Sequence, residues 1–201
     1  DDRVADRIGF RRIERQGTRL LLNGRPLTLR GICVHEDDRE LGRCTHEDDL
    51  RRRFHHLREM GANAARLAHY PHHEMAARIA DEAGILLWQE IPVYWAIAFD
   101  REATYRDAQA QLRAMIRRDE NRASVIVWGI SNENADTDAR LAFMRGLAET
   151  ARSCDPSRLV AAACLIDRVG FRIADRLAEH LDVIGLNEYF GWYEPGFENL
   201  D

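Results

Sequence analysis

Acidic, basic and amide side chains recur at one kind of position in this sequence, directly after a short apolar run. They are His35 and Glu36, Arg66 and His69, Glu90, Asn132 and Glu133, and Asn187 and Tyr189. If the apolar runs are strands of one parallel sheet, these side chains lie at the carboxyl ends of the strands and converge on one face. Carboxylates at such a face suit general acid–base chemistry, and the neighbouring groups suit a polar substrate.

The elements that would position these side chains alternate between strands and helices from Gly31 onward. Strands are expected at 62–68, 85–88, 124–130, 158–165 and 182–186, and helices at 45–60, 71–83, 103–118, 137–153 and 172–180. Thr45 is expected to cap the first helix and Gly84 to end the second. Because no Gly-rich phosphate loop follows the first strand, a barrel is favoured over a dinucleotide-binding sheet.

A complete (β/α)8 TIM barrel has eight strands and needs roughly 250 residues. This 201-residue α/β chain is therefore expected to be an incomplete TIM barrel of about six β/α units. The segment before Gly31 differs, since residues 8–14 alternate as a strand and apolar runs flank Asn23-Gly24, which is typical of a β-hairpin. We expect residues 1–15 to be the end of a preceding β-sandwich or a linker strand, and residues 16–201 to form the partial barrel.

The composition excludes several classes of function. All 29 basic residues are arginine, so no side chain can form the imine that Schiff-base aldolases and pyridoxal-phosphate enzymes require. The net charge of −5 is spread along the chain without long runs of one sign, which disfavours nucleic-acid binding. The apolar runs are too short to cross a bilayer. We therefore expect no cofactor, no nucleic-acid partner and no membrane partner.

A metal site is one alternative for the polar cluster. His35, His69, Glu90 and Glu133 are of types that bind zinc or manganese, but no His-x-His or helical His-x-x-x-His pair supports such a site. The histidine doublets at 55–56 and 72–73 are expected on solvated helix faces. The cysteines lack the paired spacing of a zinc site and are expected to be free thiols: Cys33, Cys44, Cys154 and Cys164.

Structural roles are a second alternative. Glu133 could cap the helix that follows it, and His35 and His69 could be buried histidines that bond to backbone. Among the tryptophans, Trp128 and Trp88 are expected in the core, whereas the loop residues Trp95 and Trp192 are candidates for stacking on a sugar ring.

Residues 118–133 carry the most specific signal. They end in Trp128-Gly129-Ile130-Ser131-Asn132-Glu133 and resemble the acid/base signature of glycoside hydrolase family 2, which includes β-glucuronidases and β-galactosidases. Residues 61–71 resemble the second signature of that family, with Ala65 in place of a bulkier residue. Further similar stretches are 29–31 with 35–37, 84–92 and 187–193. The resemblance covers nearly the whole chain.

The resemblance implies a retaining mechanism, in which two carboxyl groups roughly 5 Å apart flank the glycosidic bond. Glu133 would be the acid/base, with its pKa raised toward neutral by a desolvated or negatively charged setting. Asn132 would hydrogen-bond the sugar 2-hydroxyl, and Tyr189 would contact and orient the nucleophile. Arg66 would keep that nucleophile ionised. Further matches would bind substrate: His35, Glu36, His69, Glu90, Asn187, Trp192 and Tyr193.

The implied substrate is a carbohydrate, either a β-linked glucuronide or a β-linked galactoside, and residues 187–193 resemble β-glucuronidases more closely. The family nucleophile is a glutamate at the end of the seventh strand. Glu194 and Glu198 come too early for that role, so the isolated chain is expected to be inactive. A metal-dependent barrel hydrolase and a noncatalytic carbohydrate-binding fragment stay open as alternatives. Exposed edges of the first and sixth strands would favour a homo-oligomer.

Overall fold

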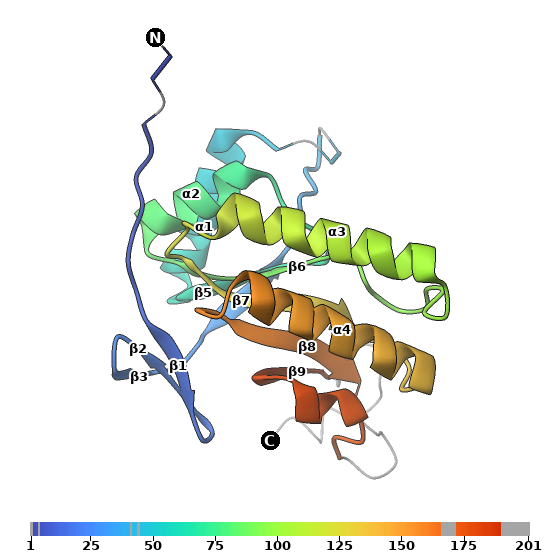
Figure 1. Cartoon of the computed structure of the whole chain (residues 1–201). Coiled ribbons are helices and arrows are strands. Elements are labelled where there is room, and N and C mark those ends of the chain that lie inside the picture. The colour runs from blue at the N-terminus through green and yellow to red at the C-terminus, as the bar shows by residue number, and fades with distance from the viewer. Residues whose placement is uncertain (1, 4, 41, 44, 166–171, 190–201) are drawn as a thin grey trace.

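The computed structural model describes residues 2–3, 5–40, 42–43, 45–165 and 172–189, which form two sheets flanked by helices (Figure 1). The first sheet is antiparallel and three-stranded, in the order β1-β2-β3. The second is parallel and six-stranded, and its strands β4 to β9 follow one another in chain order. Parallel neighbours joined through helices are the arrangement of a β/α barrel, and the predicted incomplete barrel is confirmed.

The antiparallel sheet is built by β1 (Ile13–Gln16), β2 (Arg19–Leu22) and β3 (Arg25–Leu27). Its second turn is Asn23-Gly24, and both residues have positive φ angles, 52° and 76°, as a tight hairpin turn requires. The predicted strand at 8–14 was placed too early, because regular pairing begins only at Ile13. The domain boundary at residue 15 stays a prediction.

The parallel sheet has six strands of four to eight residues: β4 (Gly31–Val34), β5 (Ala64–Leu67), β6 (Leu86–Glu90), β7 (Val125–Asn132), β8 (Leu159–Leu165) and β9 (Val183–Asn187). Every residue of β7 is buried, as expected for a parallel strand covered on both faces. Trp128, at the centre of β7, is completely buried, so its predicted place in the core is confirmed.

Four α-helices and one short 3-10 helix connect these strands and cover the outer face of the sheet (Figure 1): α1 (Glu47–Glu59), α2 (Glu74–Ala83), α3 (Glu102–Asp119), α4 (Asp138–Cys154) and η1 (Arg176–His180). Thr137 caps α4 through its side chain, and Gly84 ends α2 in the left-handed conformation. The predicted Thr45 cap is wrong, since α1 starts after His46 without a side-chain cap.

Two apolar clusters stabilise the sheet on its two faces. The outer cluster joins the helices to the strands, with Leu57, Leu112 and Met144 among its fully buried members. The inner cluster packs Ile13 of the hairpin sheet against Ile126 and Leu159, near the starts of β7 and β8. The hairpin sheet therefore covers the amino ends of the strands, which leaves their carboxyl ends to form a site.

Two predictions about single residues have definite outcomes. Cys33, Cys154 and Cys164 are free thiols as predicted, and Cys44 lies outside the described residues. The doublet at 55–56 lies exposed on α1, but in the doublet at 72–73 only His73 is exposed, and both residues precede α2. His72 is buried before α2 begins, with its Nε2 atom 3.1 Å from the Ala68 carbonyl oxygen.

In the described part of the chain, none of the helices is both long enough and apolar enough for a membrane span.

Candidate active site

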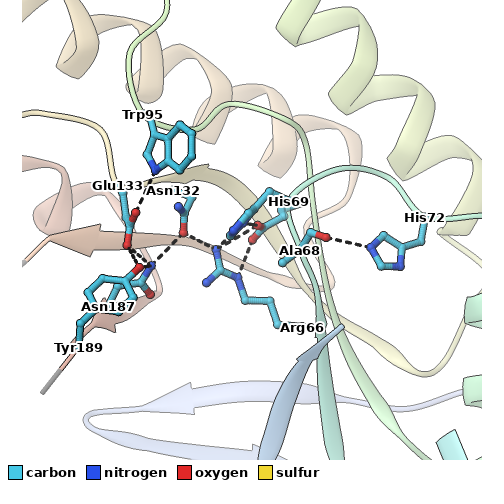
Figure 2. A network of polar contacts seen from close by, with 10 residues as sticks. Arg66, Ala68, His69, His72, Trp95, Asn132, Glu133, Asn187 and Tyr189 are labelled. Carbon is cyan, nitrogen blue, oxygen red and sulfur yellow. Dashed lines mark hydrogen bonds and ion pairs between the residues drawn. The ribbon is translucent and has the colours of Figure 1, made fainter. Parts of the chain in front are cut away.

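A continuous polar network lies at the carboxyl ends of β5, β6, β7 and β9 (Figure 2). Four strand-end residues form its frame: Arg66 on β5 and the last residues of β6, β7 and β9, which are Glu90, Asn132 and Asn187. Because neighbouring parallel strands end at the same edge, residues 66 and 187 are brought together across the sheet. The structure thus gathers most of the residues predicted from the sequence.

Glu90 anchors one end of this network. Its side chain is 1% exposed, and it receives the Arg66 guanidinium at 2.8 Å and 3.0 Å and the His69 Nδ1 atom at 2.6 Å. A buried carboxylate is tolerated only when it is paired and hydrogen-bonded in this way. Gly129 on the neighbouring strand makes the position possible, because a Cβ atom there would lie 2.6 Å from the Glu90 Cβ atom.

Asn132 joins this anchor to the other half of the network. Its Oδ1 atom accepts hydrogen bonds from Arg66 Nη2 at 2.7 Å and from Asn187 Nδ2 at 3.1 Å. The residue is buried, with only 3% of its surface exposed. The two donors consume the acceptor atom of the amide, so the orientation of Asn132 is fixed before any substrate arrives.

Glu133 forms the other end of the network and accepts three hydrogen bonds from two segments, the end of β9 and the loop that holds Trp95. Its Oε1 atom accepts from Asn187 Nδ2 at 2.7 Å and from the Tyr189 hydroxyl group. Its Oε2 atom accepts from the Trp95 indole nitrogen at 3.1 Å. The residue has a φ of 53°, in the left-handed region that a non-glycine residue rarely adopts. The surrounding structure therefore imposes both the backbone and the side-chain orientation of Glu133.

The electrostatics of Glu133 correct an expectation. Burial raises the pKa of its carboxyl group, but the hydrogen bonds from Tyr189, Asn187 and Trp95, together with the nearby His69, outweigh burial and hold the pKa below its ordinary value. The predicted raised pKa is therefore wrong for this arrangement. With no substrate bound, the three donors stabilise the ionised carboxylate.

The histidine wall beside Glu90 consists of His69 and His35. Their rings meet edge to face at 5.3 Å, and His35 is exposed. Partial desolvation of its imidazole ring and the neighbouring His69 lower the pKa of His35. Glu36 is not brought into the network, because its Oε1 atom accepts the backbone N–H of His73 at 2.6 Å at the start of α2.

The aromatic candidates have mixed outcomes. Trp192 and Tyr193 lie outside the described residues, as do Glu194 and Glu198. Trp88 is half-buried beneath the Arg66 guanidinium, whose central carbon lies 5.2 Å from the ring centre.

Within the described ranges, no three or more His, Cys, Asp or Glu side chains are grouped so that they could hold a metal ion.

The hydrogen bond from Trp95 to Glu133 is the feature that sequence reasoning missed. The two residues are 38 positions apart, and the prediction for Trp95 was stacking alone. A left-handed backbone at Trp95, with a φ of 58°, turns its side chain toward β7. No sequence signal marks this conformation, since tryptophan has no preference for positive φ.

A parallel β/α sheet with carboxylates and amides at its carboxyl ends is the arrangement in which barrel enzymes carry their active sites. Residues 13–200 match the family described as "Glycosyl hydrolases family 2, TIM barrel domain". The chain belongs to this family.

Similar proteins agree in sequence and in structure. A β-glucuronidase from Paenibacillus borealis is 32% identical over 94% of this chain, and the human β-glucuronidase is 31% identical over 92%. A β-galacturonidase from Eisenbergiella tayi, solved with galacturonate, has a TM-score of 0.86 at 31% identity and 94% coverage of this chain. A Ruminococcus gnavus β-glucuronidase has a TM-score of 0.84 at 33% identity over 92%. The chain spans about a third of each of these relatives, between 28% and 34% of their lengths.

Proposed function

We propose that this protein is a retaining β-glycosidase and that Glu133 is its acid/base. The observation that carries the proposal is the Glu133 carboxyl group, which is half-buried at the carboxyl ends of the strands and fixed by Asn187, Tyr189 and Trp95. Beside it, Arg66 holds the Asn132 amide, to which we assign the hydrogen bond to the sugar 2-hydroxyl group. Membership of the glycoside hydrolase family supports the same assignment.

The proposed cycle has two steps. First, Glu133 donates its proton to the glycosidic oxygen while a second carboxylate attacks the anomeric carbon and forms a covalent intermediate. Then Glu133 accepts a proton from the water molecule that hydrolyses this intermediate. The lowered pKa of Glu133 suits the second step. For the first step, a second carboxylate roughly 5 Å away would raise the pKa by like-charge repulsion and keep the proton in place.

We assign the nucleophile to a residue outside those that the structure describes. Glu90 is the other carboxylate of the network, but one of its oxygens receives both Arg66 and His69, and the other receives Arg66 again. A carboxylate that is already paired with a half-buried guanidinium and a histidine is a poor nucleophile. We therefore assign Glu90 and Arg66 to positioning Asn132, and the contact of Arg66 and Tyr189 with a nucleophile stays a prediction.

The proposed substrate is a β-linked uronide, with a glucuronide favoured over a galacturonide or galactoside. This proposal is supported by the similar proteins, which are named as β-glucuronidases and a β-galacturonidase. His35 and His69 line the edge of the network and are the described candidates for binding the sugar. His69 is already shared with Glu90, so it would bind through its remaining ring nitrogen.

The test is hydrolysis of aryl β-glucuronide, β-galacturonide and β-galactoside by the protein in its natural full length, with Glu133→Gln as the comparison. The expected result is turnover of a uronide that Glu133→Gln lowers by about 10²- to 10⁴-fold, the range of general acid–base catalysis. Chelators should leave the rate unchanged, which separates this proposal from a metal-dependent hydrolase. Unchanged turnover by Glu133→Gln would overturn the assignment.

A further inference from the structure

Trp95 lies in the loop between β6 and α3 and is fixed there by residues next to the catalytic carboxyl group. Its backbone N–H donates to the Asn132 carbonyl oxygen at 3.0 Å, and its own carbonyl oxygen accepts from Asn134 Nδ2 at 2.7 Å. Tyr94 forms a parallel bridge with Asn132. Asn132 and Asn134 are the sequence neighbours of Glu133 on its two sides. Their contacts hold Trp95 in its left-handed conformation.

The Trp95 side chain is held by a hydrogen bond, although most of its surface is exposed. The residue is 62% exposed, and its ring meets Tyr94 edge to face at 5.3 Å. Its indole N–H, which can only donate, is directed at Glu133 Oε2 (Figure 2). A large apolar ring held on the surface beside a catalytic carboxyl group is available to contact a ligand.

The hydrogen bonds that the described residues donate to Glu133 leave one lone-pair position of its carboxylate unoccupied. An ionised carboxylate has about four lone-pair positions, two on each oxygen. Oε1 already accepts from Asn187 and Tyr189, whereas among the described residues Oε2 accepts only from Trp95. The remaining position on Oε2 is where a proton can be carried toward a substrate.

We infer that Trp95 is a positioning residue that makes Oε2 of Glu133 the proton-transferring oxygen, and that the exposed face of its ring binds the leaving group. The inference rests on the proposed glycosidase function. As the bond between the anomeric carbon and the glycosidic oxygen breaks, the oxygen keeps the electron pair and takes the proton from Oε2. The leaving group departs as a neutral alcohol, and Glu133 is left as a carboxylate that Trp95 stabilises.

The ring position follows from the same distances. A glycosidic oxygen within hydrogen-bonding distance of Oε2, at about 2.7 Å, lies within about 6 Å of the indole nitrogen. The first atoms of the leaving group are therefore within reach of the Trp95 ring. A flat apolar leaving group, such as an aryl group, would gain most from that contact.

The charged and titratable groups around Glu133 come from several elements. Tyr189 follows β9 and His69 follows β5, and both lower its pKa with the two neutral donors. The ion pair of Arg66 and Glu90 lies behind Asn132. Removing the indole N–H changes none of these groups, so a change in the pH profile of a Trp95 variant reports the missing hydrogen bond.

The experiment compares Trp95→Phe, which keeps an aromatic face without the N–H group, with Trp95→Ala, which removes both. The readout is the pH profile of kcat/KM for an aryl uronide with a poor leaving group. Because Glu133 must be protonated to act as the acid, its pKa sets the basic limb of the profile. Trp95→Phe is expected to move that limb upward by roughly 0.5–1 pH unit, the effect of losing a hydrogen bond to a charged group. Trp95→Ala is expected to move it equally and also to raise KM for aryl leaving groups.

Tyr94→Phe is the matched control, since it changes the neighbouring loop aromatic without touching a hydrogen bond to Glu133, and its basic limb should not move. A basic limb that stays in place in Trp95→Phe would overturn the positioning role. If KM changed by the same factor for aryl and for small alkyl leaving groups between the wild type and Trp95→Ala, the ring contact would be overturned. Both failures are distinct from failure of the proposed function, in which Glu133→Gln itself would keep its turnover.

Discussion

At the amino ends of β7 and β8 an arginine is completely saturated, whereas at the carboxyl ends an arginine is shared among side chains that a substrate would meet. Arg158 donates to the carbonyl oxygens of Glu120, Arg122 and Val125 and pairs with the buried Asp155. Arg66 instead links two side chains, Glu90 and Asn132. Arginine therefore has two roles in this sheet: at one end it satisfies buried backbone groups, and at the other it orders a polar surface.

The hairpin sheet explains why the two ends differ. Its Ile13 packs beside the starts of β7 and β8, so polar groups at that end are cut off from water and must be satisfied by backbone. No such cover lies over the carboxyl ends in the described part of the chain, where Trp95 is exposed and Glu133 is half-buried. Burial makes the first region structural, and access makes the second region suitable for chemistry.

The largest expected effect on stability comes from breaking the closed end. Arg158→Ala would leave the buried Asp155 without its ion-pair partner and would remove one donor from each of three carbonyl oxygens, which should lower the free energy of unfolding by about 3–5 kcal/mol. Arg12→Ala is the control, because Arg12 pairs with Glu14 on the surface and should cost no more than about 1 kcal/mol. Urea unfolding followed by circular dichroism measures both. Equal losses would contradict the contrast drawn between buried and exposed arginine.

The next largest effect is expected from Gly129, which lies on β7 beside Glu90 at the carboxyl ends of the strands. In Gly129→Ala the new Cβ atom would lie 2.3 Å from Trp88 Nε1 and 2.6 Å from Glu90 Cβ. Overpacking of this kind costs roughly 1–3 kcal/mol, and displacing Glu90 should lower kcat/KM by about 10- to 100-fold. In Gly185→Ala the nearest atom is 3.2 Å away, at the tip of Trp88, so both effects should be smaller. If Gly129→Ala left both the stability and kcat/KM unchanged, the present position of Glu90 would not be needed.

The smallest expected effect is a pH dependence of the closed end. Burial raises the pKa of Asp155, but hydrogen bonds from Ser157 and Trp128 and the charge of Arg158 outweigh it and lower the pKa below 3.8. The stability from this lowered pKa is fully present above that value and is lost as the pH falls through the folded-state pKa. Acid unfolding below roughly pH 4 should be less steep in Asp155→Asn. An unchanged slope would assign acid unfolding to other carboxylates.

Much of the fold could be predicted because it depends on local patterns. The alternation of apolar runs and amphipathic stretches located β5 to β9 and the helices, and Gly84 and Thr137 marked helix ends. The start of α2 was missed because Pro71 and the residues after it look helical, whereas His73 accepts the backbone N–H of Met75 and begins the helix later. Prediction of the strand ends was enough to gather the site residues at one edge.

The remaining features of the site depend on contacts between distant segments. The lowered pKa of Glu133 needs donors from residues 95, 187 and 189 at once, and no local pattern encodes their convergence. Burial of His72 depends on its stacking against Tyr70, with ring centres 5.1 Å apart, which is a tertiary contact. The turn of Glu36 toward α2 is likewise set by the late start of that helix.

The most direct test of the central claim, that Glu133 is the proton donor of a glycosidase, is the leaving-group dependence of Glu133→Gln. The measurement is kcat/KM of wild type and variant on one uronide carrying either a poor or a strongly activated aryl leaving group. An acid is needed only when the leaving group is poor, so the predicted loss is about 10²- to 10⁴-fold for the poor one and far smaller for the activated one. Equal losses with both leaving groups would contradict the account.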